Sequence, residues 1–144
     1  MTTEDAGLTD RERHAQGMRV RRAVLSDAHV DAATASATDF AADWQDFITR
    51  VAWGEVWARP GLDRRSRSIA VLSSLIAHGH HEELAMHVRA ARRNGLTVDE
   101  IREVILQSAI YSGVPAANAA FRIAQEVLAD EPPVADGDGV TARS

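Results

Sequence analysis

The sequence predicts an all-α fold, a single-domain bundle of five to six helices. Three observations lead to this prediction. Apolar residues recur at spacings of three and four along most of the chain, which is the period of an amphipathic helix. Capping residues and Gly or Pro breaks separate these stretches. No alternating apolar and polar run of strand length is present, and no internal repeat stands out.

The first clear apolar stripe precedes a break at Arg59-Pro60-Gly61 and is expected to face the core. Its members are Phe40, Trp44, Phe47, Ile48 and Val51. Asp63 is suited to cap the next helix, because its carboxylate can accept from free N–H groups of the first turn. That helix is expected to end near Gly79. Its apolar side consists of Ile69, Leu72, Leu75 and Ile76.

A further helix is expected at about residues 80–94, with Asn94-Gly95 as its C-terminal cap. Thr97–Glu100 has the pattern of a capping box and should start the next helix. The stripe of that helix consists of Ile101, Val104, Ile105 and Ser108. Gly113-Val114-Pro115 interrupts it, and the proline suits the first turn of a last helix that runs to about Ala129.

For two residue types the sequence is compatible with packing either in the core or at a subunit interface. The last helix is rich in alanine, and small side chains fit either tight packing inside one subunit or a subunit interface. The three tryptophans, Trp44, Trp53 and Trp57, lie close together in sequence. Each is expected in a core or an interface rather than as a platform for a ligand.

Composition narrows the class of protein. The net charge of -5 argues against nucleic-acid binding, which normally requires a basic surface. The chain contains no cysteine, which excludes disulfides and thiolate metal sites and fits a reducing compartment. No signal peptide is visible, and no apolar run approaches the roughly 20 residues that span a bilayer. We therefore expect a cytoplasmic protein that does not enter membranes.

The 144 residues fit one domain with polar ends. We expect a flexible N-terminal segment at residues 1–16, a helical domain at 17–130 and a disordered C-terminal tail at 131–144. The tail prediction depends on Pro132-Pro133 and the Asp, Gly and Ala residues that follow.

The most informative local feature is a polar face on the central helix. His80, Glu83 and His87 fall at i, i+3 and i+7, so a helix would point all three to one side. An acid and two imidazoles can transfer protons near neutral pH. The alternatives are a solvated helix face or a metal site. The spacing differs from the His-Glu-x-x-His pattern of metalloproteases, and we expect no metal.

Three stretches resemble the carboxymuconolactone decarboxylase family, within the wider alkyl-hydroperoxidase D-like helical group. They are Arg21–Asp31, Trp53–Ser68 and Tyr111–Ala124. The most specific motifs are Trp53-Gly54-Glu55, Arg59-Pro60-Gly61-Leu62-Asp63 and Gly113-Val114-Pro115-Ala116-Ala117-Asn118. One departure is Ser112, where many relatives carry cysteine.

Peroxidase members of the group carry Cys-x-x-Cys-x-x-x-His on the central helix. In this chain His80 and Glu83 take the cysteine positions, and His87 takes the histidine position. The resemblance therefore implies that the pocket is retained and adapted to acid–base chemistry without thiols.

The resemblance implies cofactor-free decarboxylation of 4-carboxymuconolactone to 3-oxoadipate enol-lactone in protocatechuate (β-ketoadipate) catabolism. The lactone ring can accept the electrons itself, as a 2-oxyfuran dienolate. The protein must hold two carboxylates, stabilise the oxyanion and protonate the α-carbon. The resemblance also implies a ring-like homo-oligomer, a trimer or hexamer, that takes a small dicarboxylate lactone.

The catalytic candidates are His87, Glu83 and Glu55. His87 could donate to the oxyanion or deliver the proton, or it could be a satisfied core histidine. Glu83 could orient His87 or donate a proton if burial raises its pKa. Glu55 could be an acid or the structural partner of an arginine. His29 lies in a matched stretch but has no assigned role.

The substrate-binding candidates are Arg67, Arg64 and His80. A guanidinium can hold a carboxylate through two parallel hydrogen bonds, although both arginines could also be solvated surface residues. His80 is expected near the pocket, whereas His78 and His81 are expected to be exposed. Two other functions stay open. One is a related lactone isomerase or hydrolase, and the other is a non-catalytic helical oligomer that binds a small acid or a partner protein.

Overall fold

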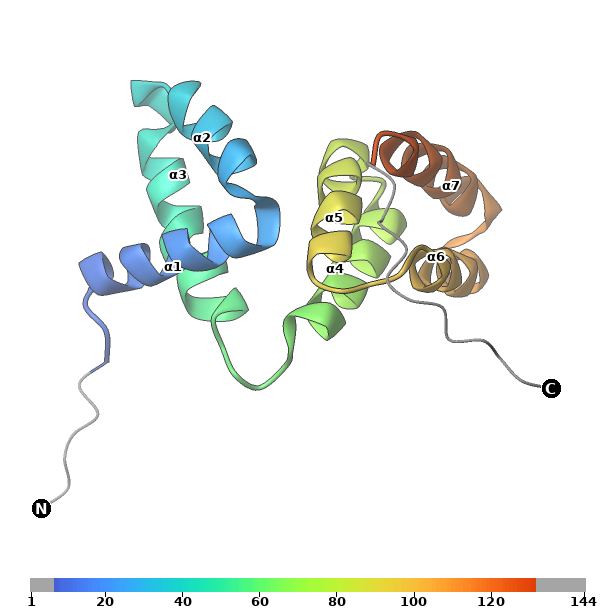
Figure 1. Ribbon diagram of the computed structural model, residues 1–144, viewed down its shortest axis with the longest axis horizontal. Coiled ribbons are helices and arrows are strands. Elements are labelled where there is room, and N and C mark those ends of the chain that lie inside the picture. The colour runs from blue at the N-terminus through green and yellow to red at the C-terminus, as the bar shows by residue number, and fades with distance from the viewer. Residues whose placement is uncertain (1–6, 132–144) are drawn as a thin grey trace, which may run out of the picture.

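The computed structural model describes residues 7–131, and this part of the chain forms seven α-helices without a β-strand (Figure 1). A 3-10 turn (η1) and a π-helix (η2) complete it. In chain order the elements are α1 (Asp10–Leu25), α2 (Asp27–Ala35), η1 (Asp39–Ala41), α3 (Ala42–Ile48), η2 (Thr49–Trp57), α4 (Arg64–His78), α5 (His81–Arg93), α6 (Val98–Ser112) and α7 (Val114–Ala129). The all-α prediction is confirmed, with slightly more helices than the five to six expected.

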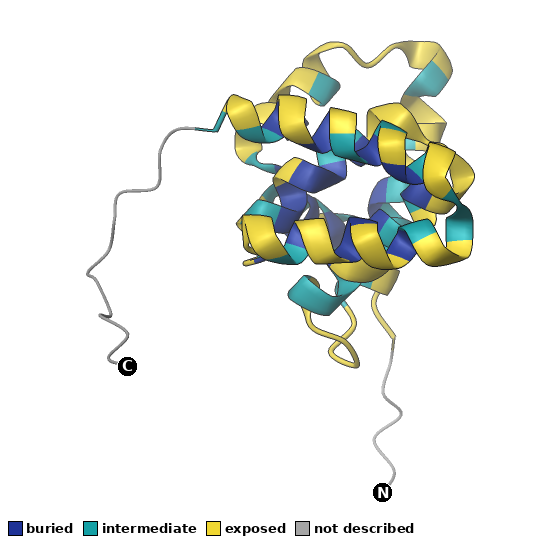
Figure 2. Cartoon of the chain, turned by 90° about the vertical axis from the view of Figure 1, so that its right-hand side faces the viewer, coloured by how far each residue is buried: buried dark blue, intermediate teal, exposed yellow. Residues whose placement is uncertain are grey.

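The helices form two halves joined by the loop before α4 (Figure 1). The first half contains α1, α2, α3 and η2, with α1 packed along η2. The second half contains α4 to α7, and Figure 2 shows its buried positions facing inward between the helices. Helix α5 packs on α4 and α7 and also on α1, so it lies between the two halves.

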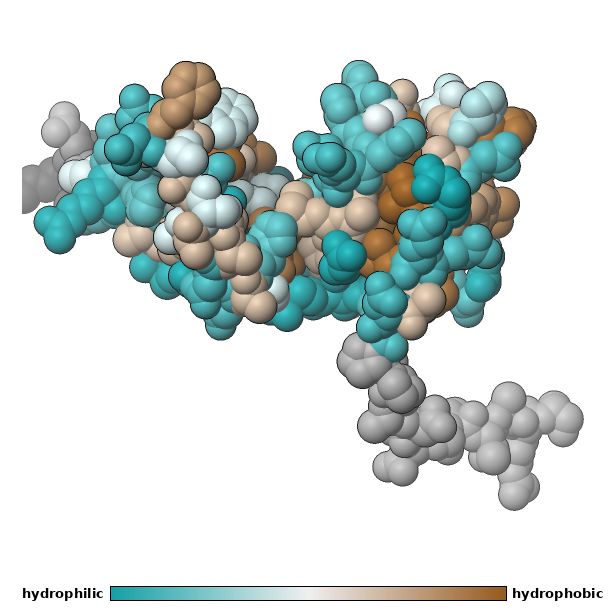
Figure 3. Space-filling model, turned by 90° about the horizontal axis from the view of Figure 1, so that it is seen from above, coloured by the Kyte–Doolittle hydropathy of each residue, from teal (hydrophilic) through white to brown (hydrophobic). Residues whose placement is uncertain are grey.

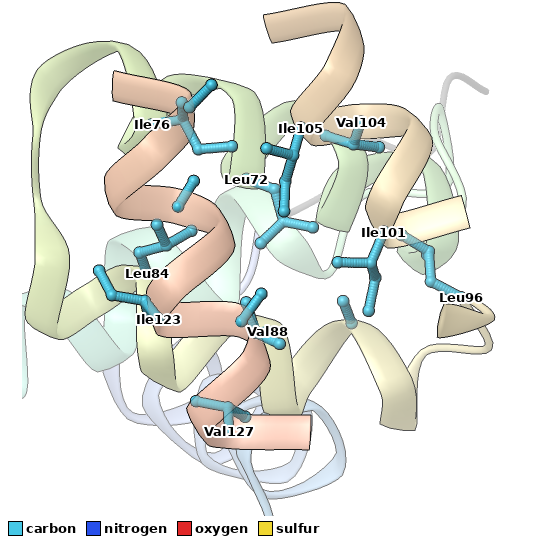
Figure 4. Close-up of a cluster of buried hydrophobic side chains, with 14 residues drawn as sticks. Leu72, Ile76, Leu84, Val88, Leu96, Ile101, Val104, Ile105, Ile123 and Val127 are labelled. Atoms are coloured by element: carbon cyan, nitrogen blue, oxygen red, sulfur yellow. The ribbon is translucent and has the colours of Figure 1, made fainter. Parts of the chain in front are cut away.

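Each half has its own hydrophobic core. The core of the second half consists of aliphatic side chains from α4, α5, α6 and α7 (Figure 4). Its largest fully buried side chains are Leu72, Leu84, Leu96 and Ile101. Burying each such side chain contributes roughly 1.5–3 kcal/mol. The core of the first half is smaller and consists of Val20, Val24, Leu25, Val30, Trp53 and Ala90.

The helix ends follow the local sequence signals. The Asp63 carboxylate accepts from the backbone N–H of Ser66 at 2.7 Å, and this confirms the predicted cap of α4. Gly79 ends that helix in the left-handed region with a φ of 68°, where glycine carries no steric penalty. Thr97 and Glu100 form the predicted capping box at α6. Each of these bonds joins residues only a few positions apart, so it depends on the local sequence and not on the packing of distant segments.

The predicted core stripe before residue 51 is wrong for its bulky aromatic members. Phe40 is fully exposed, Trp44 is 60% exposed and Phe47 is 48% exposed. The spacing was helical, as predicted for α3, but nothing in residues 7–131 covers this face. Periodicity identifies an apolar face and does not identify what covers it.

The ends of the chain differ partly from expectation. The N-terminal segment was expected to be flexible to residue 16, but α1 begins at Asp10 with a capping box at Thr9. Residues 1–6 and 132–144 of the expected flexible ends lie outside the described residues. In the part that the structure describes, no helix combines the length and apolar character needed to cross a membrane.

The alanines of α7 pack inside the subunit. Ala117, Ala120 and Ala124 are buried in the core of the second half together with Ile123 and Val127. Their small side chains allow α7 to pack against both α5 and α6. Tight packing within one subunit therefore accounts for these three positions.

Candidate active site

Helix α5 carries two buried stripes on different faces. Leu84, Val88 and Ala91 belong to the core of the second half, at spacings of four and three. His87 and Ala90 lie on the adjoining face, and Ala90 packs in the core of the first half. His87 is only 8% exposed. A histidine is therefore held at the junction of the two halves.

Two tryptophans of the π-helix η2 lie against His87. The ring centroids of Trp57 and His87 are 6.2 Å apart at 16°, and those of Trp53 and His87 are 6.5 Å apart at 14°. The two indoles also stack on each other at 5.2 Å. π-helical turns are rare and frequently occur at functional sites. This one presents two residues four positions apart to the same imidazole.

Burial controls the charge of His87. It lowers the pKa of His87 from 6.5 to about 4, with a smaller opposing effect from the Glu83 carboxylate and a further lowering by His29. The Nδ1 atom is buried and has no hydrogen-bond partner within the described residues. The imidazole is therefore neutral at pH 7 and can act as a hydrogen-bond donor or acceptor, not as a ready cation.

This lowered pKa predicts a stability change in acid. Because the unfolded chain binds a proton at His87 more readily than the folded chain, folding loses stability as the pH falls from 6.5 to about 4. The loss should approach roughly 3 kcal/mol, since one pKa unit corresponds to about 1.4 kcal/mol. Urea unfolding at pH 7 and pH 4 should show this extra loss in the wild type and not in His87→Gln.

The matched control for this experiment is His81→Gln, because His81 is exposed on the same helix. It should lose the same stability as the wild type over this pH range. An identical pH dependence in wild type and His87→Gln would show that the pKa of His87 is close to its unfolded value.

The other members of the predicted polar face are exposed. Glu83 lies one turn before His87 on α5 and is exposed at the surface. His80 is outside the helix, as the residue preceding it, and its exposed ring stacks on His78 at 5.7 Å. His78 and His81 are exposed, as expected. The structure thus brings no three potential metal ligands together within the described residues.

The predicted arginines lie at the start of α4. Arg67 donates from Nε to the Leu62 carbonyl at 3.0 Å and from Nη2 to the Arg59 carbonyl at 3.1 Å. Its guanidinium therefore braces the loop that joins the two halves. Arg64 is exposed on the first turn of α4, and Glu55 is exposed on η2. Within the described residues, no hydrogen bond or ion pair joins any of these three to His87, and none of their charges acts on its pKa.

Sequence reasoning placed two tryptophans correctly and missed an arginine. Trp53 lies in the core of the first half and Trp57 packs against it, as expected, and both also lie against His87. Arg21 is buried on α1 at 8% exposure and was given no role. A detectable sequence signal existed for it, because Arg21 lies on the apolar stripe that includes Val20 and Val24.

The fold and the site define a small all-helical protein with a neutral histidine buried against paired indoles. Residues 42–126 match the family model described as "Carboxymuconolactone decarboxylase family". The chain belongs to this family.

Two relatives align with at least 80% of the chain. It is 47% identical over 123 residues to the 4-carboxymuconolactone decarboxylase of Acinetobacter baylyi, covering 85% of this chain and 92% of that protein. It is 42% identical over 115 residues to the nitrosuccinic acid decarboxylase npaB of Metarhizium robertsii, covering 80% of each. A 4-carboxymuconolactone decarboxylase sequence from Pseudomonas putida is 46% identical over 48 residues, which is all of that sequence and 33% of this chain.

Proposed function

We propose that this protein is a carboxy-lyase that converts 4-carboxymuconolactone to 3-oxoadipate enol-lactone in protocatechuate catabolism. The observation that carries this proposal is the buried, neutral His87 beside the stacked pair Trp53 and Trp57, in a chain 47% identical to a relative with that named activity. The two relatives that align with 80% or more of the chain are both named as decarboxylases.

The proposed reaction needs no external electron acceptor. The bond between the ring γ-carbon and its carboxylate breaks, and CO2 leaves. The electron pair moves through the ring double bond to the lactone carbonyl oxygen, which gives a 2-oxyfuran dienolate. A proton then adds to the α-carbon and forms the enol-lactone. Catalysis therefore requires stabilisation of the oxyanion and delivery of one proton.

His87 is proposed to stabilise the oxyanion. A neutral imidazole can donate one N–H hydrogen bond to it, and its apolar surroundings strengthen that interaction. The indoles also offer a less polar place for the departing carboxylate, whose charge is lost in the reaction. Glu83, one turn before His87, and Glu55 remain proposed acids. Arg67, Arg64 and His80 remain proposed substrate contacts, and we propose that bound substrate or a neighbouring subunit brings them together with His87.

The test is an ultraviolet assay of the purified protein with 4-carboxymuconolactone, with the released CO2 trapped in parallel. Equal amounts of lactone consumed and CO2 formed are expected. Consumption without CO2 would favour a lactone isomerase or hydrolase instead, and no consumption would favour a non-catalytic binding protein. Nitrosuccinate should be assayed beside it, because faster turnover of that acid would assign the substrate of the second relative.

We also propose that the protein forms a homo-oligomer, a trimer or hexamer, and works in the cytoplasm. Apolar side chains are exposed on both halves, as the brown surface in Figure 3 indicates. One group is formed by Phe40, Trp44 and Phe47 on η1 and α3. A second lies at the junction of α6 and α7, where Ile110 is 80%, Tyr111 82% and Val114 65% exposed. Surfaces of this kind are typical of interfaces.

Light scattering on the purified protein should therefore give the mass of a trimer or hexamer. Ile110→Glu should shift the mass towards the monomer, because it places a charge on an apolar surface that assembly would bury. Ser74→Glu on the exposed side of α4 is the matched control and should assemble like the wild type. A stable wild-type monomer at micromolar concentration would contradict the proposal.

A further inference from the structure

Arg21 is a buried cation without an anion. Its side chain is 8% exposed, and burial lowers the pKa of its guanidinium, which nevertheless stays charged at pH 7. No carboxylate of the described residues pairs with it. Its hydrogen-bond partners are neutral, since Nη1 donates to Thr49 Oγ1 at 3.3 Å and to Gln45 Oε1 at 3.2 Å. A buried charge without a counter-charge is costly, so a fold retains one where something compensates it.

The hydrogen bonds of Arg21 are incomplete. Both Nη1 and Nη2 donate to the same oxygen, Oε1 of Gln45, each at 3.2 Å. The Nε atom is buried and has no partner within residues 7–131. One amide oxygen thus accepts from two guanidinium nitrogens, where a carboxylate would offer each nitrogen its own oxygen. A carboxylate adds a negative charge and a second acceptor oxygen to the hydrogen bonds that the Gln45 amide already makes, and a bidentate pair of arginine and carboxylate is among the strongest hydrogen-bonded pairs. A carboxylate can therefore displace the half-buried Gln45.

A cavity of about 260 Å³ leads to this guanidinium. It lies between α1, α2 and α3, and Arg21, Gln45 and Thr49 line it together with Met18. Asp46 also borders it, but Arg50 Nε and His14 Nε2 pair with that carboxylate at 2.8 and 3.8 Å. Arg21 therefore lines this cavity as a cation that is not paired with any carboxylate of the described residues.

Arg21 and His87 both interact electrostatically with the same residue, His29. His29, at the start of α2, has its pKa lowered first by burial and then by the charges of Arg21 and Arg89. The same His29 acts on His87. His29 therefore lies within electrostatic range of both Arg21 and His87. Figure 3 shows the surface notched between these halves.

We propose that the Arg21 guanidinium binds the carboxylate of the substrate that is retained, the acetate arm, after displacing the Gln45 amide. This rests on the proposed function. The departing carboxylate is a poorer candidate, because a cation bound to it would stabilise the ground state and raise the barrier. The retained arm keeps its charge throughout, so its binding anchors the ring without opposing decarboxylation.

Kinetics of Arg21 variants test this subsite. Arg21→Met should raise KM roughly 10–100-fold, the value of one charge-assisted hydrogen-bonded pair, and change kcat little. Arg21→Lys keeps the charge but loses the paired donors of the guanidinium, so its KM should lie between those of Arg21→Met and the wild type. Arg22→Met is the matched control, because this neighbouring arginine is paired with Asp27 and Asp31 on the surface. It should keep the wild-type KM.

A binding measurement separates the subsite from the reaction. Calorimetry would use two saturated lactones, which lack the ring double bond and cannot react: one keeps both carboxylates, and the other keeps only the acetate arm. Both should bind the wild type and lose affinity in Arg21→Met. Loss confined to the dicarboxylate would assign Arg21 to the departing group and overturn the proposal.

The outcomes are distinguishable. A wild type that binds both lactones through Arg21 but releases no CO2 would overturn the proposed reaction and keep the subsite. Normal turnover with an unchanged KM in Arg21→Met would overturn the subsite alone. A purely structural arginine would lower the melting temperature in Arg21→Met and leave KM as in the wild type, so thermal unfolding of each variant completes the test.

Discussion

His87→Ala should lose decarboxylase activity by about 10²–10⁴-fold in kcat, the usual effect of removing one acid–base or hydrogen-bonding group from an active site. The reason is its position, 8% exposed, neutral and in contact with Trp53 and Trp57. The oxyanion exists only after CO2 begins to leave, so a group that stabilises it acts on the transition state. The loss should therefore appear in kcat more than in KM.

The measurement is steady-state kinetics at saturating lactone, with far-ultraviolet circular dichroism to show that the helices persist. His81→Ala is the matched control, because His81 begins the same helix and is exposed. It should retain wild-type turnover. Activity of His87→Ala within twofold of the wild type would remove His87 from the mechanism. Wild-type rates should also be unchanged by chelators, and inhibition that zinc reverses would favour a metal site.

Gly17→Ala should destabilise the fold by about 3 kcal/mol, the upper part of the usual range for overpacking. An added Cβ at Gly17 would overlap the Thr49 carbonyl oxygen and lie 2.9 Å from the backbone N of Gly54. Both contacts are to the backbone of η2, which cannot rotate away. Inside a helix the same substitution would otherwise stabilise by up to about 1 kcal/mol, so the predicted sign is opposite to that of helix propensity.

Urea unfolding of the two proteins measures this difference. Gly61→Ala is the matched control, because nothing lies within 4 Å of the Cβ it would add. It should unfold at nearly the wild-type urea concentration. Gly17→Ala as stable as the wild type would show that α1 can move away from η2 at little cost. Displacement of α1 should also disturb Trp53, which packs with Val20 and Val24.

The similarity to relatives shows the family, but the geometry of the site depends on contacts between residues that are far apart in the sequence. Arg21 illustrates the difference. Its place on an apolar stripe was readable from the sequence, as a charge between Val20 and Val24. Its hydrogen-bond partners among the described residues are Gln45 and Thr49, and no acid pairs with it there. The sequence could not predict these partners, because they lie 24 and 28 positions away.

The sequence by itself determined the helical class and most helix ends. The caps at Asp63, Gly79 and Thr97 form between residues a few positions apart, so local chemistry decides them. The same holds for the heptad-like spacing that places Leu84, Val88 and Ala91 on one face of α5. Family motifs then indicated the kind of reaction before any geometry was known.

Only the tertiary structure decided which faces are covered. The aromatic stripe on α3 is exposed, although its spacing matches that of a core helix. His87 is buried and neutral because η2 brings two indoles against it, while Glu83 on the same helix stays in water. Burial and charge depend on packing between segments far apart in the chain, and helical periodicity carries no information about which segments those are.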